Sequence, residues 1–189
     1  MLFQEETSLG APGAAPPWYA LYTRHQHEKV VARVLERKGL EIFLPLYEAT
    51  RRWKDRWKRL ALPLFPCYVF VRTSLERRLD MLSAPGVFSI VGFGQPAAIP
   101  YSEIEAIRRV IGSDMRIQPY PFLKCGDWVR VKSGALAGIE GILVRKKNLA
   151  RLVLSVEILG RSAAIEVDAL SVERISPRPL NRGTLVGPV

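Results

Sequence analysis

A change of hydrophobic pattern near residue 113 divides this sequence into two differently built halves. In the first half, strand-like alternation is followed repeatedly by stretches with a helical period, whereas the second half holds only short alternating runs separated by glycines. Residues 113–123 lie between them with two prolines and no periodic pattern. We therefore predict domains over 18–112 and 124–176, a linker over 113–123, and flexible ends over 1–17 and 177–189.

The first half predicts strands and helices in alternation. The expected strands cover 18–23, 41–46, 64–71 and 87–93, and the expected helices cover 26–38, 74–82 and 102–111. This order predicts an α+β sandwich, in which helices pack on a mostly antiparallel sheet. The second half predicts a small β-barrel, because short strands near 128–132, 142–144, 152–158, 164–167 and 172–175 alternate with glycine turns.

Residues 50–59 form a basic segment with six basic residues, one acid and two tryptophans four positions apart. Because the flanks favour strands, we predict a hairpin that turns near residues 54–56. A helix would place Trp53 and Trp57 on one face, and the spacing alone leaves that alternative open. The hairpin is either a solvated excursion or an arm that faces nucleic acid; the tryptophans favour the arm, since bases stack on aromatic rings.

The charge and composition of the chain narrow the classes of partner that it is expected to bind. The 189-residue chain carries a formal net charge of +10, of which residues 18–62 contribute +6 from eleven bases and five acids. A local basic excess favours a polyanionic partner, usually nucleic acid, although a surface kept basic for solubility is the alternative.

Membrane insertion and secretion are not expected. The longest apolar run, residues 60–71, is broken by Pro63 and Pro66 and is shorter than the roughly 20 residues that a bilayer crossing needs. Glu5 and Glu6 stand where a secretion signal carries positive charge. With only two cysteines, the chain is predicted to be cytoplasmic, without a disulfide framework.

Residues that could carry catalysis or bind a metal are few. His25 and His27 are two positions apart, whereas metal-binding pairs on a helix favour a separation of four. Cys67 falls in an apolar strand, where an inert buried thiol is expected. We predict no catalytic residue, no metal and no cofactor; a small enzyme is an alternative only if His25 or Cys67 meets a carboxylate in the fold.

The sequence of Leu64–Val69 is typical of a buried strand, and the same strand could also border a binding surface. Strand alternation places Phe65 and Cys67 on one face and Pro66 and Tyr68 on the other. One aromatic ring can then enter the core while another borders a surface groove. Such a groove beside a basic face would suit a helical partner.

Several motifs resemble a known family. The first half contains WYALY at 18–22, LFPCYVFV at 64–71 and PGV at 85–87 leading to VGFG at 91–94, and the second contains GDWVRV at 126–131, GALAG at 134–138 and EG at 140–141. In this order they resemble the N-terminal (NGN) domain and the KOW motif of the NusG family of transcription factors. The Leu-Phe-Pro-x-Tyr form and the Gly-Phe-Gly step are more similar to the specialised RfaH and UpxY members than to housekeeping NusG.

The resemblance implies an NGN-type α/β sandwich followed by a small SH3-like KOW β-barrel. It implies an elongation and antitermination factor, not an enzyme, that binds the β′ clamp helices of bacterial RNA polymerase through an apolar groove. The factor would bridge the DNA channel and suppress pausing. By resemblance, the groove residues are Tyr22, Phe65, Pro66 and Tyr68.

The resemblance also implies further contacts. Arg77, Arg78, Leu79 and Asp80 occupy the segment that reaches the β gate loop in the specialised members, although their His-Thr-Thr-Thr motif is absent here. Contacts with upstream or non-template DNA are expected from the helix start, for which a solvated surface is the alternative, and from the hairpin. The candidates are Arg24, His25, His27, Lys29, Arg52, Trp53, Arg56 and Trp57.

In the second half, the resemblance assigns a partner surface to Leu136, Ile139, Ile158 and Leu159. Family members present apolar residues at these positions to a ribosomal small-subunit protein or to Rho; the aliphatic residues here argue against Rho, and core packing explains them nearly as well. The β-branched alternation predicts a barrel that keeps one fold, and we expect a monomer. The runner-up function is an RNA- or ribosome-associated KOW protein without polymerase contact.

Overall fold

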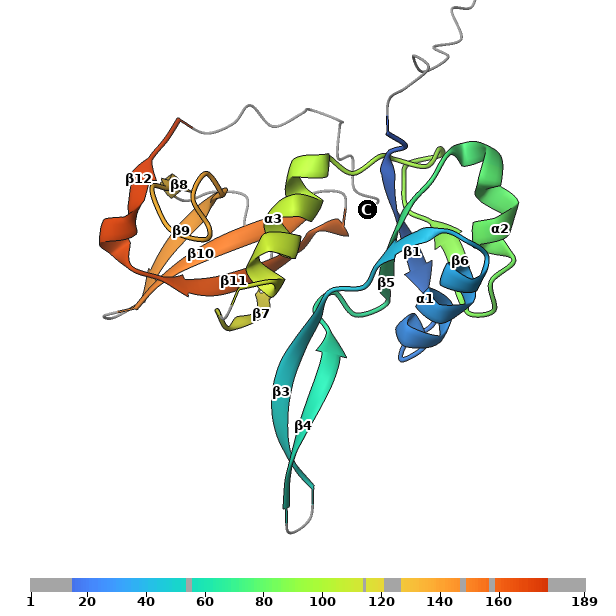
Figure 1. Ribbon diagram of the computed structural model, residues 1–189, viewed down its shortest axis with the longest axis horizontal. Coiled ribbons are helices and arrows are strands. Elements are labelled where there is room, and N and C mark those ends of the chain that lie inside the picture. The colour runs from blue at the N-terminus through green and yellow to red at the C-terminus, as the bar shows by residue number, and fades with distance from the viewer. Residues whose placement is uncertain are drawn as a thin grey trace, which may run out of the picture. The chain divides into compact units, whose positions relative to one another are not determined.

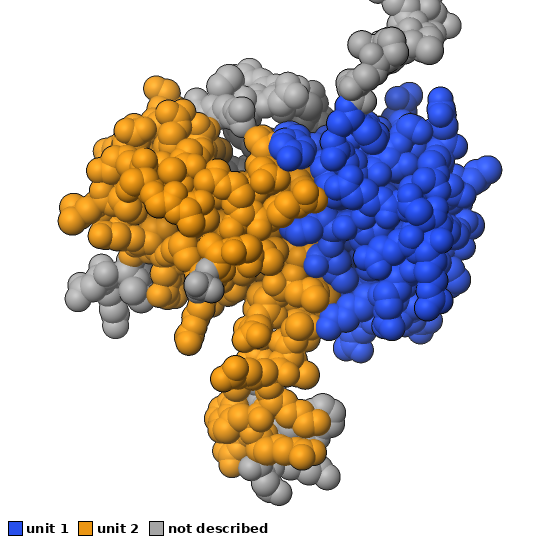
Figure 2. All heavy atoms as spheres, viewed as in Figure 1, with its two compact units in different colours: residues 1–44, 66–101 blue, residues 45–65, 102–189 orange. Residues whose placement is uncertain are grey.

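The computed structural model describes residues 15–53, 56–113, 115–120, 127–146, 149–156 and 159–176. All the strand pairs within these residues are antiparallel. The chain forms two compact units, one of residues 1–44 and 66–101 and the other of residues 45–65 and 102–189 (Figure 2). The predicted leader lies outside the described residues except for 15–17, and the predicted tail lies outside them entirely.

The first unit is a four-stranded sheet with helices on one face (Figure 1). Its elements are β1 (Trp18–Thr23), α1 (Glu28–Arg37), β2 (Glu41–Phe43), β5 (Tyr68–Arg72), η1 (Leu75–Arg77), α2 (Arg78–Leu82) and β6 (Val87–Ile90). The strand order is β2-β5-β1-β6, so β1 and β5 are central. The predicted α+β class with flanking helices on an antiparallel sheet is confirmed.

The core of this unit lies between the sheet and α1 and α2. Val31 and Leu35 from α1 and Met81 from α2 pack with Leu21 and Val69 from the two central strands, and all five are fully buried. Alternation then directs Tyr22 and Tyr68 to the opposite face. That face is also aromatic farther along β1 and β5, where the ring of Phe43 contacts those of Trp18 and Phe70, with centroids 6.3 and 6.0 Å away.

The second unit begins with the predicted hairpin. Strands β3 (Leu46–Trp53) and β4 (Arg56–Pro63) pair in register from Leu46↔Pro63 to Trp53↔Arg56, and Figure 1 shows them as a long two-stranded ribbon. The hairpin prediction is confirmed and the helical alternative is excluded.

The rest of the second unit is helix α3 (Tyr101–Ile111, whose first residue belongs to the other unit) and a six-stranded sheet. The strands, in the order β12-β8-β9-β10-β11-β7, are β7 (Ile117–Tyr120), β8 (Asp127–Val131), β9 (Glu140–Lys146), β10 (Leu149–Val156), β11 (Arg161–Val167) and β12 (Val172–Arg174), with η3 (Ala169–Ser171) before β12. Such a sheet-rich second domain is consistent with a KOW domain. Gly141 is required in β9, because a Cβ there would lie 2.5 Å from the Val153 carbonyl oxygen.

Strand β7 lies within the segment predicted to be a linker. That prediction rested on the two prolines of residues 113–123 and their lack of a periodic pattern, yet residues 117–120 pair with β11, with Pro119 opposite Ala163. Strand β7 is at the edge of the sheet. Proline has no backbone N–H to donate, and it is tolerated on an edge strand because the N–H side there can face solvent. The domain boundaries themselves stay a prediction.

Helix α3 also contacts the loop between β8 and β9. The Arg109 guanidinium donates hydrogen bonds of 2.8 Å to the carbonyls of both Ala135 and Ala137. In the described part of the chain, no helix is long and apolar enough to cross a membrane.

Candidate functional site

Three aromatic side chains gather on the sheet face that the helices leave uncovered. The Tyr22 ring lies 5.7 Å from the rings of both Tyr68 and Phe88, measured between centroids. Tyr68 is directly opposite Tyr22 in the β1–β5 register, and Phe88 is in the neighbouring strand β6. Tyr22 is 42% exposed and Phe88 is 63% exposed. We call Tyr22, Tyr68 and Phe88 the aromatic cluster; it offers apolar rings to a partner.

Phe65 does not belong to this surface. It is 1% exposed, which corrects its assignment to an accessible groove, whereas Pro66 next to it is exposed. The reason is the backbone conformation of this segment: residues 64–67 form a turn rather than the predicted strand, and Cys67 has a left-handed backbone with φ of +69°. Strand alternation therefore does not apply to Phe65.

Phe88 is the member of the aromatic cluster that the sequence analysis missed. A usable signal was present, because residues 87–93 were predicted to form a strand and Phe88 alternates with the partly buried Val87. The irregular register between β1 and β6, where Tyr22 pairs with Ser89 and Thr23 with Val87, lets Phe88 reach Tyr22.

A shallow hollow of about 200 Å³ adjoins the aromatic cluster through Phe88. It lies between α2, which contributes Arg78 and Leu82, and the loop after β6, which contributes Pro96. Gly92 is needed in that loop, since a Cβ there would lie 1.9 Å from the Gln95 carbonyl oxygen. The hollow connects the aromatic cluster with the segment that was predicted to reach the gate loop.

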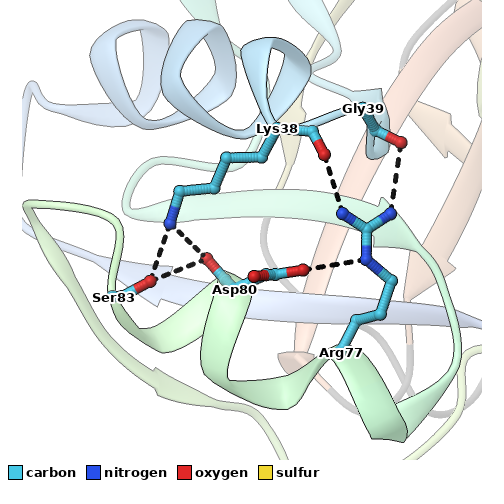
Figure 3. Close-up of polar contacts among 5 residues, drawn as sticks. All are labelled: Lys38, Gly39, Arg77, Asp80 and Ser83. Atoms are coloured by element: carbon cyan, nitrogen blue, oxygen red, sulfur yellow. Dashed lines mark hydrogen bonds and ion pairs between the residues drawn. The ribbon is translucent and has the colours of Figure 1, made fainter.

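Within that segment, Arg77 and Asp80 form internal contacts (Figure 3). Arg77 donates to the carbonyls of Lys38 (2.7 Å) and Gly39 (3.3 Å) and pairs with the Asp80 carboxylate at 2.8 Å. Lys38 in turn donates to the Asp80 carbonyl (2.9 Å) and to the Ser83 hydroxyl (2.7 Å). These bonds connect η1 and α2 to the end of α1.

Arg78 and Leu79 are the accessible members of the segment. Leu79 is 79% exposed and Arg78 is exposed beside the hollow. A contact with a second partner surface would therefore fall on these two residues, while Arg77 and Asp80 hold the segment in place.

Replacing Arg77 with alanine is expected to lower the free energy of unfolding by about 1 kcal/mol, a value reduced for the partial exposure of the side chain. Arg78→Ala is the matched control, because it removes the same charge from an exposed side chain that forms no hydrogen bond or ion pair among the described residues, and it should leave stability nearly unchanged. Chemical denaturation measures both. Equal stability of the two variants would contradict the anchoring role.

The hairpin presents one fully exposed face. Arg52 pairs with Trp57, and Thr50 pairs with Arg59, and all four residues are exposed, with Trp57 at 69%. Arg56 is exposed on the other face, where its partner is Trp53, whose side chain lies outside the described residues. A ring between guanidinium groups is suited to stacking on a base while cations neutralise phosphate.

The loop between β1 and α1 holds the other predicted DNA contacts. Arg24, His25 and Lys29 are exposed and His27 is half-buried. The loop turns through Gln26, which has φ of +63°. All four predicted residues are therefore at least partly accessible.

This loop also meets the turn before β5. His25, Glu28 and Cys67 have potential ligand atoms within 4.8 Å of one another. The two-residue spacing of His25 and His27 gave no sign of this, because the third member is about forty positions away in the chain. The meeting of His25 or Cys67 with a carboxylate, on which the enzyme alternative depended, is therefore present, and Glu28 supplies the carboxylate.

In the second unit, three of the four predicted partner residues are core residues. Leu136 and Ile139 are each 4% exposed and Leu159 is 8% exposed, so they cannot present a surface. This favours the core-packing interpretation. Ile158 lies outside the described residues.

Two described groups have clearly shifted pKa values, and both shifts have structural causes. Burial raises the pKa of the Tyr19 phenol. A hydrogen bond from Arg130 to Glu140, together with the carboxylate charge, raises the pKa of the Arg130 guanidinium. Each shift favours the form already present at neutral pH.

Comparison with known proteins gives a consistent result. Residues 16–108 match the NusG family model, described as transcription termination factor nusG. The transcription termination/antitermination protein NusG of Pseudomonas aeruginosa is 29% identical over 177 residues, which cover 85% of this chain and 99% of that protein. The NusG proteins of Helicobacter pylori and Escherichia coli K12 are 26% and 28% identical, over 84% and 71% of this chain and 98% and 77% of theirs.

The fold agrees with these relatives. A solved structure titled "Domain interaction in Thermotoga maritima NusG" aligns with a TM-score of 0.52 at 24% identity, covering 85% of this chain and 97% of that one. The α+β unit, its inserted hairpin and the following sheet therefore share the fold of that NusG structure. The family-model match and the similarity to NusG proteins over most of the chain together support a NusG-family factor.

Proposed function

We propose that this chain is an elongation and antitermination factor that docks its aromatic cluster onto the β′ clamp helices of RNA polymerase. The observation that carries the proposal is the contact of Tyr22, Tyr68 and Phe88 in one aromatic cluster, in which Tyr22 and Phe88 are exposed and Tyr68 is half-buried. Aromatic anchors at the centre of an interface can each contribute about 2 kcal/mol or more. Pro66, two positions before Tyr68 in the chain, is also exposed.

A second contact supports a bridging role. Arg78 and Leu79 are accessible beside the hollow that Phe88 also borders. If they contact the β gate loop while the aromatic cluster binds the clamp, the factor binds the closed clamp more tightly than the open one. Such differential binding shifts the population away from paused states without any chemical step. An operon-specific role of the RfaH or UpxY type and ribosome binding stay predictions, as does a monomeric state.

Nucleic-acid contact is assigned to the hairpin. Arg52→Ala is expected to weaken binding to single-stranded or bubble DNA and to reduce the slope of log affinity against log salt by about 0.7–0.9, because one phosphate contact is lost. Trp57→Ala should weaken binding by about 1–3 kcal/mol with the slope unchanged, since stacking involves no counterion release. Fluorescence anisotropy over a salt series measures both.

Glu48→Ala is the control for these variants, because Glu48 lies on the same exposed face and has no positive charge to lose. It should leave the salt slope unchanged. If the salt slope of Arg52→Ala equals that of the parent, Arg52 does not contact a phosphate.

Copurification of the full chain with core RNA polymerase tests the proposal as a whole. We expect a stoichiometric complex that shortens pauses in a single-round transcription assay. Binding to ribosomes or RNA without binding to core polymerase would favour the runner-up function, an RNA- or ribosome-associated KOW protein.

A further inference from the structure

We propose that His25, Glu28 and Cys67 form a binding site for a borderline-soft divalent cation, of which Zn²⁺ is the representative. The three residues come from two segments that the fold brings together: the β1–α1 loop with the first residue of α1, and the turn before β5. Their potential ligand atoms all lie within 4.8 Å of one another. The proposal does not depend on polymerase binding.

The geometry fits a tetrahedral ion. The Cys67 Sγ and His25 Nδ1 atoms are 3.7 Å apart. With Zn–N about 2.1 Å and Zn–S about 2.3 Å, a tetrahedral Zn²⁺ separates two such ligand atoms by about 3.6 Å. The sulfur and the nitrogen can therefore bind one ion with little movement.

The donor set selects the class of metal. A thiolate and an imidazole favour zinc and similar transition metals, whereas Mg²⁺ and Ca²⁺ prefer sites made only of oxygen. Three protein ligands leave the fourth position of a tetrahedral ion open. Because His25 is exposed and Cys67 is half-buried, water or a partner group can reach that position.

The charge of Glu28 supports a cation here. Glu28 is 3% exposed, and among the described residues its carboxylate forms no ion pair with a lysine or arginine. It accepts a hydrogen bond of 2.8 Å from the Cys67 N–H. A carboxylate can accept about four contacts, so this bond leaves capacity for a metal, and a buried charge is costly unless it is compensated.

The backbone holds the two segments in this arrangement. Thr23 N–H donates to the Cys67 carbonyl at 2.8 Å, and the Cys67 N–H is bound to Glu28. Cys67 has φ of +69°, a conformation that glycine adopts more readily than any residue with a Cβ. A thiol is thus retained at a position where the backbone alone would favour glycine.

Metal titration of the full-length, reduced and metal-stripped protein tests the site. Zn²⁺ in competition with a chromophoric chelator should bind with one equivalent at this site, and Co²⁺ should give the near-ultraviolet charge-transfer band of a thiolate ligand. Cys67→Gly, His25→Ala and Glu28→Gln should each weaken Zn²⁺ binding by at least about tenfold.

Two features of the variants keep the test decisive. Cys67→Gly removes the sulfur but suits the positive φ, so the fold should be retained, as circular dichroism can verify. Cys125→Ala is the matched control that removes the other cysteine, and it should bind Zn²⁺ like the parent. Binding that is absent in the parent, or unchanged in Cys67→Gly, would overturn the proposal.

Discussion

Replacing Tyr68 with alanine is expected to weaken the binding of this chain to core RNA polymerase about thirtyfold, the equivalent of about 2 kcal/mol. Tyr68 is the half-buried member of the aromatic cluster, held opposite Tyr22 by the β1–β5 register. A ring that is already fixed in the free protein loses little side-chain entropy on binding. Its removal also leaves Tyr22 without one neighbour, so the two truncations should be coupled.

Four further variants complete this experiment. Tyr22→Ala and the Tyr22→Ala/Tyr68→Ala pair complete a double-mutant cycle, and Tyr68→Phe keeps the ring and should retain binding. Tyr101→Ala is the matched control, because it removes a tyrosine that is 55% exposed and outside the aromatic cluster. Biolayer interferometry with immobilised core polymerase gives the affinities, and circular dichroism checks the fold. Parental affinity in both single alanine variants would exclude docking through the aromatic cluster.

Regular elements with strong periodicity were predictable from the sequence. Strand β1 was predicted over its whole length, and α1 was predicted within two residues at its start. The hairpin was predicted from the strand character of its flanks, although the tryptophan spacing also allowed a helix. In each case the pattern repeats over several residues, so local and tertiary preferences agree.

Single conformations set by distant contacts were not predictable. Nothing in the sequence near Cys67 predicts a left-handed backbone conformation, because cysteine is not a residue that favours this conformation. The turn is fixed by Glu28, 39 positions earlier in the chain. The same long-range meeting creates the His25–Glu28–Cys67 group and displaces Phe65 from the strand pattern. Strand β7 was missed because proline was taken as evidence against a strand, and its edge position is a property of the finished sheet.

The burial of Phe65 leads to the prediction with the largest effect on stability. Phe65→Ala is expected to lower the free energy of unfolding by about 3–5 kcal/mol, because it removes a fully buried ring and leaves a cavity that the surroundings fill only in part. Leu64, also 1% exposed, precedes it, and the Leu64 N–H donates a 2.8 Å hydrogen bond to the Pro45 carbonyl. This bond fixes the backbone, so the segment cannot easily shift to close the cavity.

Phe88→Ala is the control for Phe65→Ala, since it removes an equal ring from a position that is 63% exposed. Its unfolding free energy should change by less than about 0.5 kcal/mol, while its polymerase binding should weaken. Denaturant melts and polymerase binding, measured on both variants, therefore separate a core role from a surface role. For Phe65→Ala we expect a large loss of stability and, under conditions where it is folded, parental affinity for polymerase. A stable Phe65→Ala variant that no longer binds polymerase would indicate that Phe65 belongs to the docking surface, and it would contradict the assignment of Phe65 to the core.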